Sequence, residues 1–354
     1  MTERTVVMQV TVLGAGGTVG RRIGSLLDAD QVPWRRLDAA AGDVDLEVSQ
    51  VLIGAAGGDL EGTRRAVTAA LQSGIDVVDV DREAGHLRWL HALAADVGTS
   101  SGARLVGGAG LRWAVGDLLA GVAAELVPEP VTVHVAYTAG GGRRHLTPGE
   151  RRAELAALGQ DGGALVEGRP VPEPPGGRRR LAWFPRPVGP SHAAAVPAGE
   201  VITVPRHLPT VRTVHSYEAM AGWRAELLQA RANLARTDRG RRWMERRLAT
   251  DRRPARPARP ARPAELAAER WGCVAEVVGG RTLGRAWAYG HDPVEVTARL
   301  AVAFGLRLAT GTLAPAGGGP LAPSELVAPG LLLDELADTG TLRWSRSHTI
   351  LEDR

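Results

Sequence analysis

The chain has 354 residues, more than the usual length of one domain, which predicts two domains. Hydrophobic residues make up 44% and charged residues 23%, a balance that excludes a chain without a folded core. The single cysteine, Cys273, excludes a disulfide framework and a multi-cysteine metal site. Neither a run of about 18 apolar residues nor a signal-peptide pattern occurs, so we expect a cytoplasmic protein with no membrane partner.

The basic residues are unusual in kind and in distribution. All 43 are arginine, which excludes a Schiff-base lysine, a P-loop lysine and a Tyr-x-x-x-Lys pair. Residues 236–262 hold eleven arginines against Asp238, Glu245 and Asp251, a local charge of +8 in a chain whose total is +4. A nucleic-acid-binding protein spreads its basic residues along a groove with interleaved aromatic residues. Because the excess here belongs to one segment, we expect no nucleic-acid partner.

The first strong motif is the segment VTVLGAGGTVG at 10–20, which predicts a strand, a glycine-rich turn and the start of a helix. The strict G-x-G-x-x-G form fails, because Val19 stands where its last glycine would be. Glycine still lets the backbone turn tightly and approach a pyrophosphate, which the helix N-terminus binds through free N–H groups. The motif therefore predicts a dinucleotide site, and the alternative is a purely structural turn. Its candidate residues are Gly14, Gly16, Gly17, Thr18, Val19 and Gly20.

Further alternating units follow the glycine loop. Strands are predicted at 31–38, 51–58, 75–80 and 104–106, and helices at 61–73 and 83–97. Strands that alternate with helices indicate a parallel, doubly wound sheet. Small residues end the strand at 51–58, at the sheet edge where a cofactor would pass. These further cofactor candidates are Gly54, Ala55, Ala56 and Gly57.

The choice between NAD and NADP stays open in the sequence. Asp38 lies 18 residues after Gly20, where a carboxylate could bind the ribose hydroxyl groups. Arg35 and Arg36 could instead hold a 2′-phosphate. The alternative is that all three are exposed loop charges.

From residue 131 the pattern changes. Residues 131–138 alternate with period two, which predicts a half-buried strand of an antiparallel sheet. The prediction continues with strands at 181–184, 200–204 and 211–217 and with a hairpin at 271–289. It also includes a capping box at 147–150 and helices at 292–309 and 329–339. Proline at every third residue in 251–263 predicts an extended spacer, and the alternative is weak binding to an acidic partner.

The order of these segments resembles the saccharopine dehydrogenase-like oxidoreductases. GIDVVDV at 74–80 is similar to the family's Gly-x-x-Tyr-Val-Asp strand, and GGAGLRWAVGD at 107–117 is similar to its Gly-x-Gly-x-x-Pro-Gly-x-x-Asp loop. The segments 182–189, 204–206 and 317–325 also look like family sequence. Trp113 and Ala114 replace the Pro-Gly pair, so we expect a substrate other than saccharopine.

The resemblance implies an α/β fold, with a Rossmann-type doubly wound parallel sheet and an inserted α+β mixed-sheet second domain. We expect a dinucleotide-binding domain at 1–127, a substrate and dimerisation domain at 128–290, and C-terminal helices at 291–354 that return to the first domain. The second domain would contain the Arg/Pro-rich insertion at 236–263.

The resemblance also implies an NAD(P)-dependent oxidoreductase, a homodimer, that transfers hydride to or from a C=N, C=O or conjugated C=C bond. Its substrate would be a small molecule, such as a secondary metabolite. The alternative is a non-redox descendant that serves as a binding, cyclising or scaffold protein.

Hydride transfer needs an acid or base near the reacting atom and a group that orients the substrate. Asp81, like Asp79, ends a parallel strand, and Arg112 could bind a substrate carboxylate in a bidentate way. The alternative for these and the other candidates is helix capping or solvent exposure. We expect no metal site, because no paired-histidine spacing occurs. The remaining candidates are Asp117 at a helix start, Tyr137 facing the cleft, and the loop histidines His145 and His192.

Overall fold

A computed structural model describes residues 9–38, 46, 49–57, 59–140, 158, 163–250, 263–311 and 317–351. The chain forms two compact units. The first comprises Met1–Asp81, His86–Leu111 and Val294–Val327, and the second comprises Arg82–Gly85, Arg112–Pro293 and Ala328–Arg354. The boundary between the two units falls after Leu111 rather than after the expected residue 127, so the helix that follows belongs to the second unit. The C-terminal part likewise divides, since only Val294–Val327 returns to the first unit.

The first unit contains a six-stranded parallel sheet. The strand order reverses at β1, which has β2 on one side and β3 on the other, so this is a doubly wound sheet with its switch point at β1. The expected Rossmann-type fold is confirmed. In spatial order the strands are β14 (Gly319–Leu321), β5 (Arg104–Gly107), β4 (Asp76–Asp79), β3 (Val51–Gly54), β1 (Val10–Leu13) and β2 (Trp34–Leu37).

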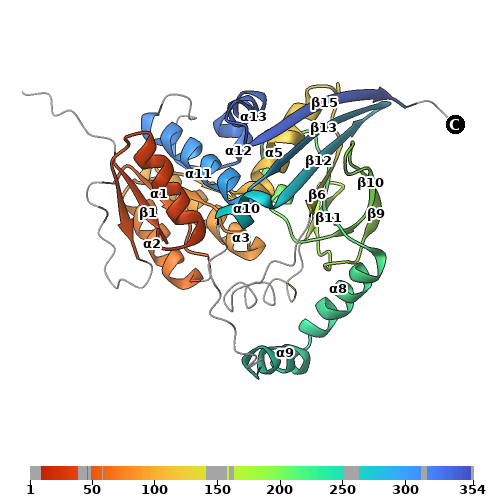
Figure 1. The fold of residues 1–354 in the computed structure, drawn as a ribbon, viewed down its shortest axis with the longest axis horizontal. Helices are drawn as coiled ribbons and strands as arrows, with labels where there is room; N and C mark the ends of the chain where they lie inside the picture. Colours follow the sequence, from red (N-terminus) through yellow and green to blue (C-terminus); the bar gives the residue numbers. More distant parts are fainter. Residues whose placement is uncertain are drawn as a thin grey trace, which may run out of the picture. The chain divides into compact units, whose positions relative to one another are not determined.

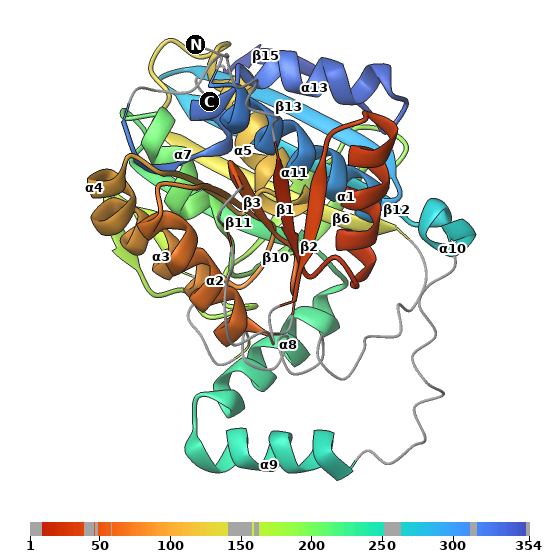
Figure 2. The same ribbon diagram turned by 90° about the vertical axis from the view of Figure 1, so that its left-hand side faces the viewer.

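Helices cover both faces of this sheet. Figures 1 and 2 show α1 and α11 beside each other, with α2 and α3 on the other side of the strands. A Cβ atom at Gly24 of α1 would lie 2.6 Å from the Trp34 ring, and one at Gly305 of α11 would lie 3.0 Å from Ile53. The helices are α1 (Thr18–Ala29), α2 (Leu60–Gln72), α3 (Ala84–Leu93), the π-helix η1 (Ala94–Gly98), α4 (Thr99–Ser101), α11 (Pro293–Thr310) and α12 (Pro323–Leu326).

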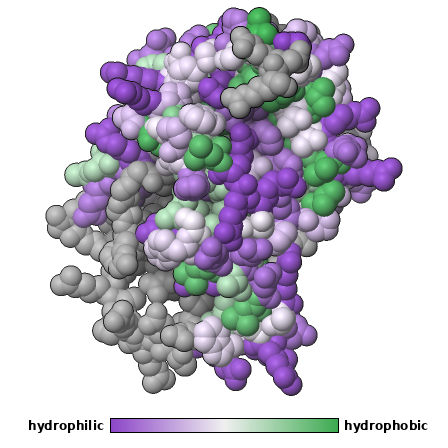
Figure 3. Space-filling model, turned by 90° about the vertical axis from the view of Figure 1, so that its right-hand side faces the viewer, coloured by the Kyte–Doolittle hydropathy of each residue, from purple (hydrophilic) through white to green (hydrophobic). Residues whose placement is uncertain are grey.

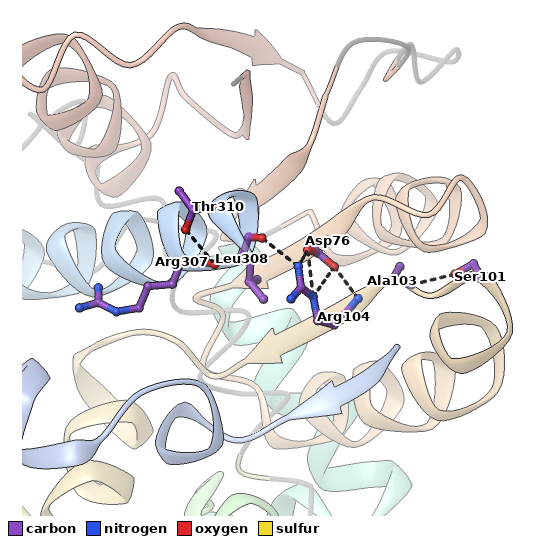
Figure 4. A network of polar contacts seen from close by, with 7 residues as sticks. All are labelled: Asp76, Ser101, Ala103, Arg104, Arg307, Leu308 and Thr310. Atoms are coloured by element: carbon purple, nitrogen blue, oxygen red, sulfur yellow. Dashed lines mark hydrogen bonds and ion pairs between the residues drawn. The ribbon is translucent and has the colours of Figure 1, made fainter. Parts of the chain in front are cut away.

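A charged network ties the amino-terminal ends of two strands to α11 (Figure 4). Asp76 begins β4 and Arg104 begins β5, and the two form an ion pair. The Asp76 carboxylate also accepts the Arg104 backbone N–H at 2.6 Å, and the guanidinium donates to the Leu308 carbonyl at 2.8 Å. The network lies at the end of the sheet opposite to the glycine loop, so its role is structural.

The second unit contains a nine-stranded sheet that is mixed, as expected. The expected antiparallel pairing of residues 131–138 holds on one side only, because β6 pairs antiparallel with β12 and in parallel with β11. The strands on the main path are β15 (Leu342–Ile350), β13 (Thr282–His291), β12 (Arg270–Gly279), β6 (Thr132–Gly140), β11 (Thr213–Ala219), β10 (Pro190–Ala195) and β9 (Arg179–Trp183), with β7 (Ala164–Val166) and β8 (Arg169–Val171) beside β11.

One face of this sheet packs on α5 and α13. A Cβ atom at Gly116 of α5 would lie 2.8 Å from Val135 on β6, and the Trp344 indole N–H on β15 donates to Asp334 of α13 at 2.9 Å. The helices are α5 (Leu111–Ala124), α7 (Glu200–His207), α8 (Gly222–Ala235), α9 (Asp238–Thr250), α10 (Pro263–Ala268) and α13 (Pro329–Asp338).

Two local predictions were wrong. Residues 200–204 form the first turns of α7 rather than a strand, because the buried side chains are Glu200, Thr203 and Val204, a helical spacing. His192 lies in strand β10 rather than in a loop. Residues 238–250, inside the expected Arg/Pro-rich insertion, are helical. The extended spacer, apart from Pro263, the capping box at 147–150 and His145 lie outside the described residues.

Candidate functional site

Two glycines of the N-terminal loop are required by close packing. Gly14 has φ +74°, in the left-handed region, and a Cβ atom there would lie 2.5 Å from the Cα of Ala56. A Cβ atom at Gly20 would overlap the carbonyl oxygen of Gly14. The Gly14 N–H donates to the Leu37 carbonyl at 3.1 Å, which ties the loop to the end of β2. These contacts fix the course of the turn.

The other two glycines leave the loop open. A Cβ atom at Gly16 would meet nothing within 4 Å, and one at Gly17 would meet only the Gly14 and Ala55 carbonyl oxygens, at 3.2 and 3.8 Å. Gly17 is the N-cap of α1, and no side chain caps the helix, whose first turn contains no acidic residue. Thr18 and Val19 thus begin a helix that has free N–H groups. The loop offers the space and the donors that a pyrophosphate requires.

The predicted small residues after β3 lie against this loop. The Ala55 N–H donates to the Leu13 carbonyl at 3.0 Å, and Ala56 packs against Gly14. A Cβ atom at Gly57 would meet nothing within 4 Å. The carboxyl ends of β1 and β3 therefore form one edge of small residues at the switch point, where doubly wound sheets bind ligands.

The structure separates the two arginines of β2. The Arg35 guanidinium donates to Thr11 at 3.1 Å and to Ser49 at 3.4 Å, so it is used within the fold. Arg36 points to the opposite face and is exposed, as is Asp38 directly after the strand. Arg36 and Asp38 thus remain the two candidates that would contact the adenosine ribose.

Asp79 and His86 form a pair at the carboxyl end of β4. The Asp79 side chain is buried and accepts the Asp81 N–H at 2.9 Å, and it lies 3.6 Å from Nε2 of the buried His86. Burial lowers the pKa of His86, but the Asp79 and Asp81 carboxylates outweigh it and raise the pKa above its ordinary value. Asp81 is half-buried. We did not predict His86 as a site residue. It lies in the helix that follows the strand, and no short sequence motif links it to Asp79.

In the second unit the Tyr137 hydroxyl is sealed inside a buried network. It accepts the backbone N–H of Trp113 at 2.8 Å and that of Gly116 at 3.2 Å, and it donates to Oε1 of Glu200. The other oxygen of Glu200 accepts the Ser216 hydroxyl at 3.1 Å. Tyr137 is only 4% exposed, so the structure shows the hydroxyl holding the start of α5 rather than facing open space.

The network holds a strained turn. Trp113 has φ +82° and ψ −55°, a conformation that costs free energy for any residue other than glycine. A Cβ atom at Gly116 would overlap the Tyr137 hydroxyl and lie 2.5 Å from Glu200, so only glycine allows this approach. Proline could not occupy this position, because its ring excludes a positive φ. The turn places Arg112 at the edge of the network.

Three of the predicted site residues lie on one face of the second sheet or at its edge, namely Arg112, Tyr137 and His192. The Arg112 guanidinium lies over the Tyr137 ring, 5.6 Å from its centroid, and donates to Glu218 at 2.6 Å. Both side chains of the Arg112–Glu218 pair are partly exposed, at 25% and 30%. Strand register places Glu218 opposite Ala194, so His192 points to this face and is exposed. Arg112, Glu218 and His192 are thus accessible polar groups on this face.

Asp117 and Glu200 are inaccessible by comparison. Asp117 is fully buried, 3.1 Å from Nε2 of His207 at the end of α7. Burial raises the pKa of Glu200 to about 7, and the nearby Asp117 carboxylate acts in the same direction. Burial also raises the pKa of the Cys273 thiol, consistent with a core cysteine. No spacing in the sequence pointed to Glu218 or His207, because each meets its partner only through long-range contacts.

The described residues contain neither a metal-binding cluster nor a membrane-spanning helix. Among these residues there is no group of three histidine, cysteine, aspartate or glutamate side chains that could hold a metal ion. In the same part of the chain, no helix combines the length and the apolar character needed to cross a membrane.

No family model matches the chain, and no curated protein matches it. Among solved structures, the chain is similar to apo saccharopine dehydrogenase (L-Glu forming) from Saccharomyces cerevisiae, with a TM-score of 0.56 and 15% identity over 96% of this chain and 100% of that chain. It is also similar to a mutant meso-dapdh from Clostridium tetani E88, solved with DAP, with a TM-score of 0.45 and 12% identity over 93% and 99%. The first likeness confirms the expected resemblance at the level of the fold.

Proposed function

We propose that the protein is an NAD(P)-dependent oxidoreductase that acts on a small molecule. The observation that carries this proposal is the glycine loop. Gly14 and Gly20 are fixed by packing, whereas Gly16 leaves open space beside the N-terminus of α1, which no side chain caps. A purely structural turn needs the packed glycines but has no need of the open Gly16 or of an uncapped helix.

Two segments of the first unit would bind the dinucleotide. The N–H groups at the start of α1 would hold the pyrophosphate, and the residues 54–57 would line its path. When bound, the dinucleotide supplies hydride to, or accepts it from, a C=N, C=O or conjugated C=C bond of the substrate. Asp81 and His192 stay our candidates for moving a proton, because neither side chain is sealed in the core. The buried Asp79–His86 pair would act as a positioning pair, because Asp79 accepts the Asp81 N–H.

The partly exposed Arg112 is the candidate for orienting the substrate. Its guanidinium fork is held by Glu218 through one nitrogen, so the fork has further donors for a carboxylate. Tyr137 and Asp117 would then act as positioning residues, since their polar groups are buried and engaged. We propose a substrate other than saccharopine, because Trp113 gives this loop a conformation that the family's proline could not adopt.

The cofactor choice rests on β2. The exposed Arg36 would favour the 2′-phosphate of NADP, and the exposed Asp38 would favour the ribose hydroxyls of NAD. Replacing Arg36 by Ala tests this choice. A selective loss of affinity for NADPH assigns NADP to the protein, and an equal effect on NADPH and NADH leaves Arg36 without a role. Arg224→Ala, on an exposed arginine of α8, is the matched control.

The finer features of the proposal follow the same reasoning. We propose a cytoplasmic homodimer, in which the 1–127 region binds the cofactor and the 128–290 region supplies the substrate and dimer contacts. We propose no nucleic-acid partner, because the arginine excess belongs to one segment rather than to the fold. A role in secondary metabolism would fit a substrate that differs from the amino acids of central metabolism.

Oxidation of NADPH and NADH, followed by absorbance with panels of ketones, ketones plus ammonia, and enones, tests the proposed chemistry. We expect turnover with one of these classes, and we expect Arg112→Gln to raise KM for a carboxylate substrate at least about tenfold through the lost bidentate contact. Arg212→Gln serves as the control for removal of an arginine elsewhere in the unit. Tight dinucleotide binding with no turnover in any panel would favour the alternative, a non-redox descendant.

A further inference from the structure

Large hydrophobic side chains are exposed on the helices α8 and α9 of the second unit. Trp223 is 63% exposed, Leu227 is 44%, Leu234 is 41% and Trp243 is 47%. Figures 1 and 2 show α9 following α8 with a sharp change of direction. We call this surface, with the arginines that flank it, the arm surface.

The α8 part of the arm surface is one stripe. Trp223, Leu227 and Leu234 are spaced by four and seven residues, so they lie on the same side of the helix over about 16 Å. The small residues Ala225, Ala232 and Ala235 are buried on the other side, where α8 packs on the rest of the unit. The stripe therefore faces away from the core and is not a misplaced packing face.

The stripe continues into an open hollow that has a strongly basic rim. Leu234 and Trp243 line a hollow of about 700 Å³, together with Arg239, Arg242 and Arg246. Arg239 is exposed, and Arg242 donates to a backbone carbonyl, that of Asp238, at 3.2 Å. On α8, the Arg224 guanidinium lies 5.3 Å from the Trp223 ring centroid. Guanidinium groups thus lie beside the apolar side chains at the start of α8 and around the hollow.

We propose that the arm surface is a docking site for an anionic lipid membrane. Tryptophan and leucine side chains insert at the boundary of headgroups and acyl chains, whereas arginines beside them bind lipid phosphates. Each basic residue near an anionic surface adds to the attraction. This peripheral contact differs from our expectation of no membrane partner, which rested on the absence of a long apolar run.

The composition of the stripe favours lipid over the other polyanions. Single-stranded nucleic acid binds by base stacking on aromatic rings, and Leu227 and Leu234 provide no ring for this contact. A second copy of the arm would bring two sets of arginines together, which like-charge repulsion opposes. Figure 3 shows hydrophobic patches set among hydrophilic side chains on the face that it presents.

Flotation of the full chain with lipid vesicles tests the proposal. The variant Trp223→Ser/Leu227→Ser removes half of the exposed apolar side chains, and Trp183→Ser, at another tryptophan that is 50% exposed, is the matched control. With vesicles of about 30% phosphatidylglycerol at low salt, we expect the double variant to bind at least about tenfold more weakly than the parent chain, with Trp183→Ser within about twofold. Arg239→Gln/Arg242→Gln should weaken binding similarly and reduce its salt dependence.

Cooperative thermal unfolding shows whether each variant has folded. We expect all of them to fold, because the replaced side chains are exposed. Absence of parent-chain binding to anionic vesicles, or equal binding by the double variant and the parent, would overturn the proposal. It would also be overturned if the double variant lost binding only to single-stranded RNA, or if it turned a dimer into a monomer with vesicle binding unchanged. The outcome does not depend on cofactor binding, so it stands or fails separately from the proposed oxidoreductase activity.

Discussion

Replacement of Glu200 by Gln should change how the stability of the protein depends on pH. Glu200 is fully buried, and burial raises its pKa from the ordinary value of 4.5 to about 7. Between these two values the native state holds a proton that the unfolded state has released, so the free energy of unfolding falls as pH rises. The shift corresponds to a loss of about 3 kcal/mol across this range.

The amide of the Glu200→Gln variant holds no titrating proton, so this loss should disappear. Its oxygen can still accept the Tyr137 hydroxyl, and its nitrogen can donate to the Ser216 oxygen. Urea denaturation at about pH 5, 6, 7 and 8 measures the effect, with Glu226→Gln as the control on an exposed carboxylate of α8. The stability of Glu200→Gln relative to the parent should rise by about 2–3 kcal/mol from pH 5 to pH 8.

Ionisable groups far from Glu200 contribute equally to both proteins, so their contributions largely cancel in the difference. Parallel stability curves for the parent chain and Glu200→Gln over this pH range would refute the reasoning. Such a result would mean that Glu200 ionises in the native state as it does in water.

Three further substitutions test packing and polar contacts in the two units. Tyr137→Phe leaves two backbone N–H groups and Glu200 without their partner, so we expect a loss of about 2–4 kcal/mol in urea denaturation, and a loss under about 0.5 kcal/mol would contradict the network. Gly116→Ala should cost at least about 2 kcal/mol by overlap with the Tyr137 hydroxyl, whereas Gly57→Ala, in open space, should be nearly neutral; equal effects would argue against the packing. Asp76→Asn should lower the thermal midpoint by removing the ion pair to Arg104, and an unchanged midpoint would show that the network adds no stability.

The fold could be predicted because its signals are local. The strand, glycine turn and helix at 10–29 follow from residue types and spacing over a few residues, and so do the hairpin of β12 and β13 and the helix α13. Residues 200–204 show the limit of such signals. Their apolar residues suit a strand as well as a helix, and the burial of Glu200 by tertiary contacts selects the helix.

The candidate site was less predictable, because its second half is assembled from distant segments. Arg112 and Tyr137 were singled out, but their partners Glu218 and Glu200 lie 106 and 63 residues away in the chain. No spacing rule connects residues that meet only through strand register and helix packing. The cofactor half could be proposed from local sequence, since glycines in one short loop carry both the turn and the open space, and its binding of a dinucleotide stays a prediction.

Titration calorimetry of the full chain with NADPH and NADH tests most directly whether the glycine loop binds a nicotinamide dinucleotide. We expect one site per chain in the parent, and at least about a hundredfold loss of affinity in Gly17→Asp, which places a side chain and a negative charge at the pyrophosphate position. Gly222→Asp, at the open start of α8, should bind like the parent. Absence of binding in the parent, or unchanged affinity in a folded Gly17→Asp, would contradict the account.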